Sequence, residues 1–237
     1  MKFNLKAAIL AALVLTPAVS FAQEAAPAAA DEESNFSWNG ALVSDYIFRG
    51  LTQTNEDPAL QAGVDYAFGD SGFYAGIWGS NVDFSDSPAK DFDSPDFEVD
   101  YYVGWSTDLG ERFNLDLSVV AYQYYGASSS YGSVNYNEFI AKFALTDIIV
   151  LTAAYTGDYA NTGADSTYLN LGNSWGIGRD FSLNAGFGRT FDDTNGSYND
   201  WNIGVSKAIG PMELGLNYYD TTIDDTDTFV FSIKFEG

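Results

Sequence analysis

Residues 97–106 read FEVDYYVGWS, and the two faces of this segment differ in chemistry. Successive side chains of an extended strand point to opposite faces. One face therefore holds Phe97, Val99, Tyr101, Val103 and Trp105. The other face holds Glu98, Asp100, Tyr102, Gly104 and Ser106. The pattern predicts a strand with one apolar face and one polar, partly acidic face.

The same alternation recurs along the chain from Phe36 onward, interrupted by clusters of Gly, Asn, Asp and Ser. The runs have about 9 to 14 residues, more than the roughly 5 or 6 residues of a typical soluble strand and close to the length of a tilted strand that crosses a hydrocarbon layer. Twelve strands are predicted, over residues 36–49, 59–68, 73–84, 96–106, 113–125, 134–145, 148–157, 166–177, 181–191, 199–209, 212–220 and 227–236.

The connections between these runs alternate in length. The long polar ones cover residues 50–58, 85–95, 126–133, 158–165, 192–198 and 221–226. The tight ones cover residues 69–72, 107–112, 146–147, 178–180 and 210–211. This alternation is typical of a transmembrane up-and-down antiparallel β-barrel with short periplasmic turns and longer extracellular loops. We therefore expect an all-β outer-membrane barrel of about 12 strands over residues 36–237.

A soluble β-barrel is the alternative, because turning the two faces inside out leaves the alternation unchanged. Such a protein would bind an apolar ligand in the periplasm. Strand length, the alternation of turn lengths and aromatic residues near the strand ends favour the membrane form, since aromatic girdles lie at membrane interfaces.

The amino-terminal residues have the features of an export signal. Lys2 and Lys6 precede an apolar run over residues 7–19, and Ala22 ends a segment with small residues at the positions that signal peptidase reads. We expect residues 1–22 to be a cleaved signal peptide and residues 23–35, which are rich in Ala and acidic, to be a flexible leader. The expected location is the cell outer membrane.

Composition narrows the possible functions. The chain has no histidine and no cysteine, and 33 acidic residues against 10 basic ones give a net charge of −23. This charge argues against nucleic acid as a partner. The segment GNSWG at 172–176 matches the G-x-S-x-G elbow of esterases, but a catalytic Ser174 would need a strand–turn–helix context and a histidine. We expect no enzyme, no catalytic residue and no cofactor.

Acidic clusters suggest divalent cations, but none has the spacing of an EF-hand loop. In the first cluster, Pro95 stands where a ligand would be needed. We predict no dedicated metal site, with weak divalent binding as the alternative. The clusters are Asp91, Asp93 and Asp96; Asp192 and Asp193; and Asp224, Asp225 and Asp227.

Charged residues on the polar faces predict an acidic channel lining. Carboxylate rings favour cations, and a lipid-facing charge at the membrane midplane costs roughly 2–4 kcal/mol for Lys or Arg. The alternative is that opposite charges pair and close the interior. The predicted pore-lining residues are Asp45, Arg49, Asp65, Asp83, Glu98, Asp100, Asp116, Glu138, Lys142, Glu213 and Lys234.

Four segments resemble the TorF-type family of proteobacterial outer-membrane porins. They are SDYIFRGLTQTNEDPALQAGVDYAF at 44–68, GFYAGIWGSNVDF at 72–84, FEVDYYVGW at 97–105 and TFVFSIKF at 228–235. The resemblance implies an outer-membrane β-barrel with a pore. The expected partners are outer-membrane lipid and small hydrophilic solutes or cations, and the sequence fixes neither the solute nor the oligomeric state.

Three side-chain placements extend this interpretation. In the segment SDYIFRG at 44–50, alternation predicts Tyr46 and Phe48 on the lipid side and Asp45 and Arg49 in the lumen. Arg189 and Lys207 fall on apolar faces but near strand ends, where long side chains reach the headgroups.

Overall fold

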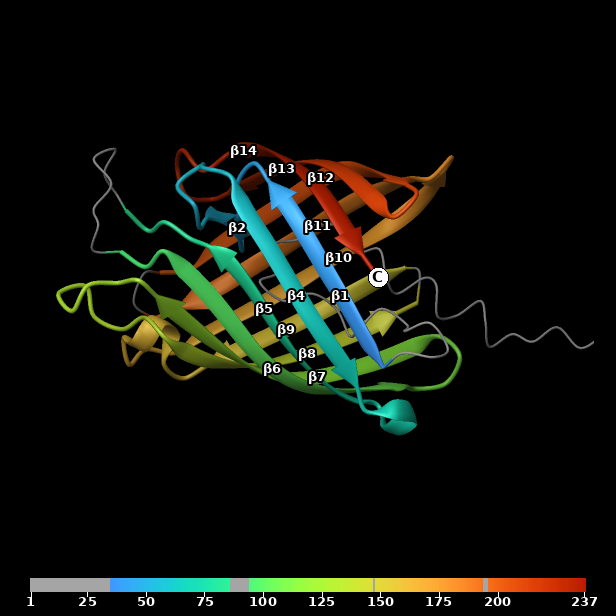
Figure 1. Cartoon of the computed structure of the whole chain (residues 1–237), viewed down its shortest axis with the longest axis horizontal. Helices are drawn as coiled ribbons and strands as arrows, with labels where there is room; N and C mark the ends of the chain where they lie inside the picture. The colour runs from blue at the N-terminus through green and yellow to red at the C-terminus, as the bar shows by residue number, and fades with distance from the viewer. Residues whose placement is uncertain (1–34, 86–93, 147, 194–195) are drawn as a thin grey trace, which may run out of the picture.

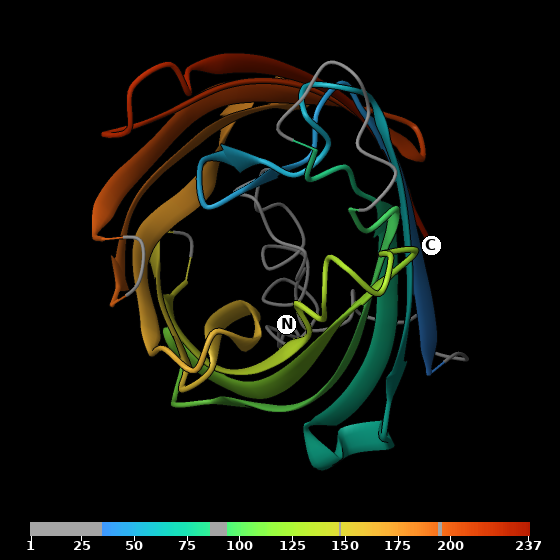
Figure 2. The same cartoon turned by 90° about the vertical axis from the view of Figure 1, so that its left-hand side faces the viewer.

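The computed structural model describes residues 35–85, 94–146, 148–193 and 196–237. Twelve antiparallel strands close into one barrel (Figures 1 and 2), so the predicted all-β architecture is confirmed. The predicted signal peptide and leader lie outside the described residues, apart from Asn35. The barrel strands are β1 (Phe36–Val43), β4 (Ala59–Ala67), β5 (Phe73–Asn81), β6 (Phe97–Asp108), β7 (Phe113–Tyr125), β8 (Tyr136–Leu145), β9 (Ile149–Thr156), β10 (Ser166–Gly178), β11 (Phe181–Asp192), β12 (Tyr198–Ile209), β13 (Met212–Thr221) and β14 (Thr228–Glu236).

Each barrel strand pairs with its neighbours along the chain, and β1 also pairs with β14 to close the ring. Long connections lie at one end of the barrel, here called the long-loop end, and tight turns lie at the other, the short-turn end (Figure 1). Two 3₁₀ helices, η2 (Gly69–Ser71) and η3 (Tyr159–Asn161), lie in connections at the short-turn and long-loop ends, respectively.

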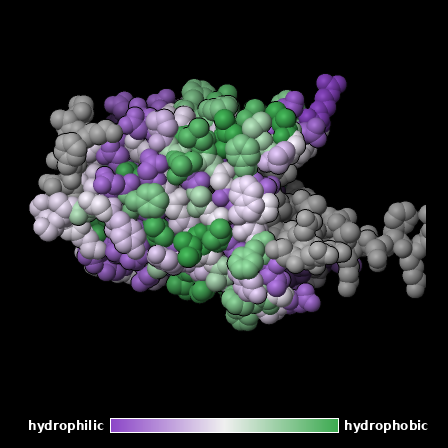
Figure 3. Space-filling view, in the orientation of Figure 1, coloured by the Kyte–Doolittle hydropathy of each residue, from purple (hydrophilic) through white to green (hydrophobic). Residues whose placement is uncertain are grey.

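The apolar faces of the strands point outward and the polar faces point inward. On β6, Phe97 and Val103 are 45% and 60% exposed, whereas Glu98 and Asp100 are 1% and 0% exposed. Apolar residues gather over the middle of the face shown in Figure 3, with hydrophilic residues toward the long-loop end. This is the arrangement of a membrane barrel and the inverse of a soluble one. In the part of the chain that the structure describes, no helix is long and apolar enough to cross a membrane.

Glycines make room for tyrosine rings on the inner wall. Tyr74 lies opposite Gly104, and Tyr102 lies opposite Gly76, on the neighbouring strands β5 and β6. A Cβ atom added at Gly104 would collide with the ring of Tyr74. The absence of a side chain at Gly104 therefore allows the Tyr74 hydroxyl to reach Asp116, to which it donates hydrogen bonds of 2.9 and 3.0 Å.

We expect Gly104→Val to destabilise the barrel by about 1–3 kcal/mol, the usual cost of overpacking. The added side chain displaces Tyr74 and breaks its contact with Asp116. The midpoint of denaturant unfolding in detergent measures the effect. Gly176→Val is the matched control, because nothing lies within 4 Å of a Cβ atom there. Equal midpoints for the two variants would contradict the packing argument.

The first predicted strand, 36–49, is too long. β1 ends at Val43, and the following segment folds into the barrel at the long-loop end (Figure 2). We call residues 44–58 the inner hairpin; it contains β2 (Ile47–Phe48) and β3 (Leu51–Thr52), which pair with each other. Arg49 and Gly50 have φ angles of 50° and 81° and form the tight turn between these strands. Alternation continues across residues 44–48 in the sequence, so it could not show where the barrel strand stops.

The placement of Tyr46 and Phe48 on the lipid side is therefore wrong. Tyr46 is buried inside the barrel with its ring centroid 5.6 Å from that of Trp78, and Phe48 is half-buried. Trp38 and Leu42, which precede the hairpin on β1, face outward.

The two bases predicted on apolar faces lie near strand ends. Arg189 is exposed close to the end of β11, where it donates a 2.8 Å hydrogen bond to Asn199 and stacks over Phe191. Lys207 lies close to the end of β12, with Nζ 4.7 Å from the ring centroid of Phe181. The predicted strand faces therefore hold for both residues.

Candidate functional site

The inner hairpin is held in shape by hydrogen bonds to a buried carboxylate. Asp45 Oδ1 accepts from Thr52 Oγ1 at 2.7 Å and from Thr54 Oγ1 at 2.9 Å. Thr54 Oγ1 in turn accepts from the backbone N–H of Tyr46 at 3.1 Å. Burial raises the pKa of the Asp45 carboxyl, while the two hydroxyls act in the opposite direction. These contacts tie the two arms of the hairpin together.

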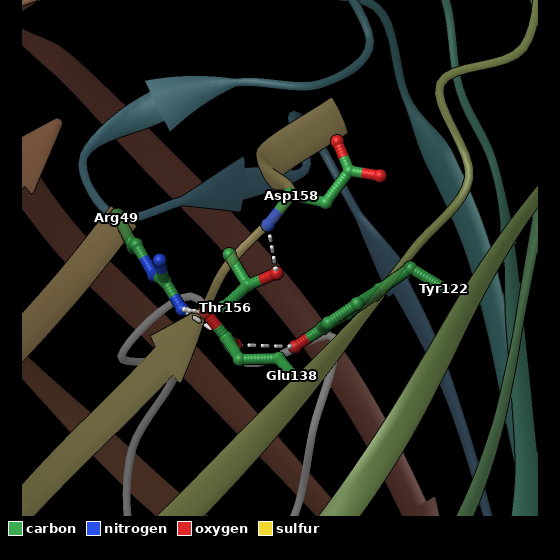
Figure 4. Close-up of polar contacts among 5 residues, drawn as sticks. All are labelled: Arg49, Tyr122, Glu138, Thr156 and Asp158. Atoms are coloured by element: carbon green, nitrogen blue, oxygen red, sulfur yellow. Dashed lines mark hydrogen bonds and ion pairs between the residues drawn. The ribbon is translucent and has the colours of Figure 1, made fainter. Parts of the chain in front are cut away.

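An ion pair joins the turn of the hairpin to the opposite wall (Figure 4). Arg49 Nη2 donates to both carboxylate oxygens of Glu138, on β8, at 2.7 Å. Both side chains are buried. Tyr122 donates a further hydrogen bond of 3.2 Å to Glu138 Oε2. Burial, the largest single influence, lowers the pKa of Arg49, but Glu138 together with Tyr136 and Tyr122 outweighs it and holds that pKa well above its usual value.

Aromatic rings surround this ion pair. The Arg49 guanidinium lies 4.6 Å from the ring centroids of both Phe48 and Tyr168. Tyr122 and Tyr136 stack with centroids 4.6 Å apart, and Tyr136 meets Tyr159 of η3 at 5.1 Å. Next to η3, the backbone N–H of Asp158 donates to Thr156 Oγ1 at 3.2 Å (Figure 4). The hairpin and these rings narrow the barrel at its long-loop end.

Acidic groups lie on the walls beside the hairpin. Glu98 and Asp100, both on β6, are fully buried, and Tyr124 donates a 3.0 Å hydrogen bond to Glu98 Oε1. Asp200 on β12 accepts from the Tyr168 hydroxyl at 3.1 Å. Asp83 lies at the rim, where its N–H donates to Gln53 O of the hairpin at 2.8 Å and its carboxylate accepts from Ser85.

The remaining predicted lining residues lie in the short-turn half. Asp65 accepts from Tyr102, and Glu213 accepts from Ser206 at 3.1 Å. Two half-buried lysines stand directly across from acids on adjacent strands, in the register pairs Asp116–Lys142 and Glu213–Lys234. The long-loop half of the interior is therefore acidic and aromatic. In the short-turn half, acids face lysines on adjacent strands.

All eleven predicted lining residues fall within the described ranges. The structure brings Arg49 to Glu138 across the barrel and keeps Glu98 and Asp100 together, whereas Asp65, Glu213 and Lys234 lie farther along toward the short-turn end. The prediction missed Asp200, although the alternation of Asp200 with Asn202 and Ser206 places it on the inner face. Among the inward tyrosines it placed Tyr102 on the polar face, but it assigned Tyr46 to the lipid side and gave Tyr122 and Tyr136 no role.

The segment 172–176 does not form a nucleophile elbow. It lies inside β10, which continues as a strand to Gly178. Ser174 donates a 2.9 Å hydrogen bond to Asn184 Oδ1. Of the acidic clusters, Asp91 and Asp93 lie outside the described residues.

Comparisons with known proteins support the fold. The structure called "KdgM porin" has 8% sequence identity and a TM-score of 0.50, with 85% of this chain and 96% of that chain covered. A structure described as "Unveiling the Mechanism Behind the in-meso Crystallization of Membrane Proteins" has 10% identity and a TM-score of 0.54, with 85% of this chain and 83% of that chain covered. At these identities the likeness shows the barrel fold of outer-membrane porins. No curated protein sequence matches the chain.

The match to a family model covers residues 27–235, which includes the inner hairpin and every strand of the barrel except the last residue of β14. The chain belongs to the family described as "Bacterial protein of unknown function (Gcw_chp)".

Proposed function

We propose that the protein is an outer-membrane channel for the passive diffusion of small hydrophilic solutes, with a preference for cations. The observation that carries this proposal is the acidic interior beside the inner hairpin, where Glu98, Asp100 and Asp200 are buried in addition to the Arg49–Glu138 ion pair. The mechanism has no chemical step. Selection results from the width of the barrel at the hairpin and from the summed field of the inward carboxylates.

The lengths of the connections indicate how the barrel is oriented in the membrane. We place the long-loop end outside the cell and the short-turn end in the periplasm, after a signal peptide over residues 1–22 is removed. The TorF-type resemblance and the fold shared with the KdgM porin support this placement. Twelve strands lie between the eight whose interior is filled by side chains and the sixteen that leave an aqueous channel, so the hairpin decides how much of the lumen is open.

A closed structural or interaction barrel is the second candidate. It is favoured by the buried Arg49–Glu138 pair and the packed rings, which occupy the interior at the long-loop end. In that case the acidic outer loops would contact a partner. The two candidates differ in one measurable property, because only the channel conducts ions.

We expect purified protein in a planar bilayer under a salt gradient to show conductance steps with a cation-selective reversal potential. Glu213→Gln should shift that potential toward zero, because Glu213 is half-buried in the lumen near the short-turn mouth. Asp70→Asn is the control, since Asp70 lies in η2, at an exposed turn. Absence of steps would favour the closed barrel, and an anion-selective potential would refute the acidic lining.

A further inference from the structure

Two neighbouring carboxyl groups on β6 are buried and lack hydrogen-bond donors for three of their four oxygens. Glu98 and Asp100 are 1% and 0% exposed and stand two residues apart on the inner face. Glu98 Oε1 accepts a hydrogen bond from Tyr124, but Glu98 Oε2 and both carboxylate oxygens of Asp100 have no hydrogen-bond partner. An unpaired buried carboxylate is costly. The arrangement therefore calls for a group that the protein chain itself does not supply.

A third unpaired oxygen group faces the same place from a different segment. The Tyr46 hydroxyl, on the inner hairpin, is buried beside Glu98 and forms no hydrogen bond of regular geometry. The Tyr46 ring packs against Trp78, which lies directly across from Asp100 in the β5–β6 register. A phenol is neutral at neutral pH in its ordinary protonation state, so Tyr46 offers an uncharged oxygen ligand beside two carboxyl groups.

The basic side chain of the inner hairpin, Arg49, does not pair with Glu98 or Asp100. Arg49 directs Nη2 at both oxygens of Glu138, and its Nη1 is buried without a hydrogen-bond partner, so it donates to neither Glu98 nor Asp100. The other side chains that flank the two carboxylates on adjacent strands are Trp78 and Ser80 on β5 and Tyr122 and Tyr124 on β7. All four are uncharged in their ordinary protonation states at neutral pH. Two carboxyl groups are thereby left facing one phenol, with no basic side chain directly across from them on β5 or β7.

We propose that Glu98, Asp100 and the Tyr46 hydroxyl bind a hard divalent metal cation of the Ca²⁺ type, which links the inner hairpin to the barrel wall. Hard cations take oxygen ligands, and a divalent ion neutralises both carboxylates. The four unpaired oxygens form an incomplete shell for Ca²⁺, which takes 6–8 ligands, so water completes it. The described residues contain no group of three or more His, Cys, Asp or Glu side chains that could hold a metal ion, so the phenol supplies the third protein ligand.

The site is separate from the question of conduction, because a metal can fasten the hairpin in an open or a closed barrel. The expected affinity is that of a weak extracellular site, roughly 10⁻⁴ to 10⁻³ M. A cation at this position would couple divalent concentration outside the cell to the rigidity of the hairpin.

Terbium luminescence tests the proposal directly. Tb³⁺ occupies Ca²⁺ sites and emits when nearby Tyr or Trp rings are excited, and Tyr46, Trp78 and Tyr124 lie at the site. The full chain, refolded in detergent and stripped with a chelator, is titrated with Tb³⁺ and then competed with Ca²⁺. Heat unfolding with Ca²⁺ or with chelator gives a second readout. The variants are Glu98→Gln with Asp100→Asn, and Tyr46→Phe.

The wild type should bind Tb³⁺ with sensitised emission that Ca²⁺ reverses, and Ca²⁺ should raise its unfolding midpoint. The double variant should lose at least about tenfold in affinity together with the Ca²⁺ effect, and Tyr46→Phe should lose a smaller, severalfold amount. The control is Asp224→Asn with Asp225→Asn, which removes exposed loop acids and should leave the response unchanged.

Two results would overturn the proposal. One is a double variant that keeps the emission and the Ca²⁺ shift. The other is a double variant that is more stable than the wild type with Ca²⁺ and with chelator alike, which would mean that protons or water, rather than a metal, satisfy these carboxylates. Neither result depends on whether the barrel conducts.

Discussion

Arg49→Ala is expected to raise the single-channel conductance and to strengthen the cation preference. The substitution removes the positive charge and a long side chain from the level at which the inner hairpin narrows the barrel. It also leaves Glu138 buried with Tyr122 as its remaining hydrogen-bond donor. Breaking a buried pair by removing one partner costs about 3–5 kcal/mol, so the free energy of unfolding should fall by a similar amount.

Three measurements separate these effects. Bilayer recordings give conductance and reversal potential, and denaturant unfolding in detergent gives stability. Arg112→Ala is the control, because Arg112 is an exposed arginine at a short turn. The double variant Arg49→Met with Glu138→Leu should recover most of the stability, since apolar replacement of a buried pair is often neutral, while the cation preference falls. An unchanged conductance in Arg49→Ala would indicate a barrel that is closed at this level.

Removal of the inner hairpin is expected to have a larger effect on conductance, a severalfold increase. Val43 and Ala59 are partners in the β1–β4 ladder. A two-residue Asn-Gly turn, which suits the twist of antiparallel strands, can therefore replace residues 44–58 without altering the barrel register. The variant should fold, because all twelve barrel strands remain. It should be less stable, since it loses the buried side chains of Tyr46, Ile47 and Thr54.

Conductance steps before and after excision measure this prediction, and heat-dependent gel mobility confirms that the barrel has folded. The control shortens the connection 222–227, whose residues are mostly exposed. A folded excision variant with wild-type conductance would show that the narrowest part of the lumen lies in the short-turn half, with Asp116 and Lys142.

The barrel could be predicted from the sequence because its signal is local. Alternation with period two and the lengths of the turns are properties of neighbouring residues, and the predicted strand from 113 to 125 matches β7 at both ends. The inward direction of Glu98, Asp100 and Glu138 follows from the same rule. Asp45 and Arg49 also point inward, although they do so from the hairpin rather than from a barrel strand.

The contacts across the lumen could not be predicted in this way. Alternation gives the face of a residue but neither its depth nor its partner, and Arg49 and Glu138 are 89 residues apart in sequence. The end of β1 was missed because residues on both sides of Val43 alternate equally well, while the turn at Arg49 depends on backbone conformation. Apart from Tyr102, the inward tyrosines were not predicted, because a phenol suits a membrane interface and a polar interior alike.

The closure of the barrel has a consequence for how the chain folds. Every barrel strand pairs with its neighbour in sequence except at the β1–β14 seam, where the Phe231 N–H donates to Ser44 Oγ across 187 residues. Local hairpins form quickly, whereas contacts between distant segments must first overcome the entropy of closing a long loop. Until that seam forms, β1 and β14 expose unpaired edges that can join other chains. We therefore expect closure of the seam to set the folding rate, and the interval before it to be the one in which the chain most needs protection from aggregation.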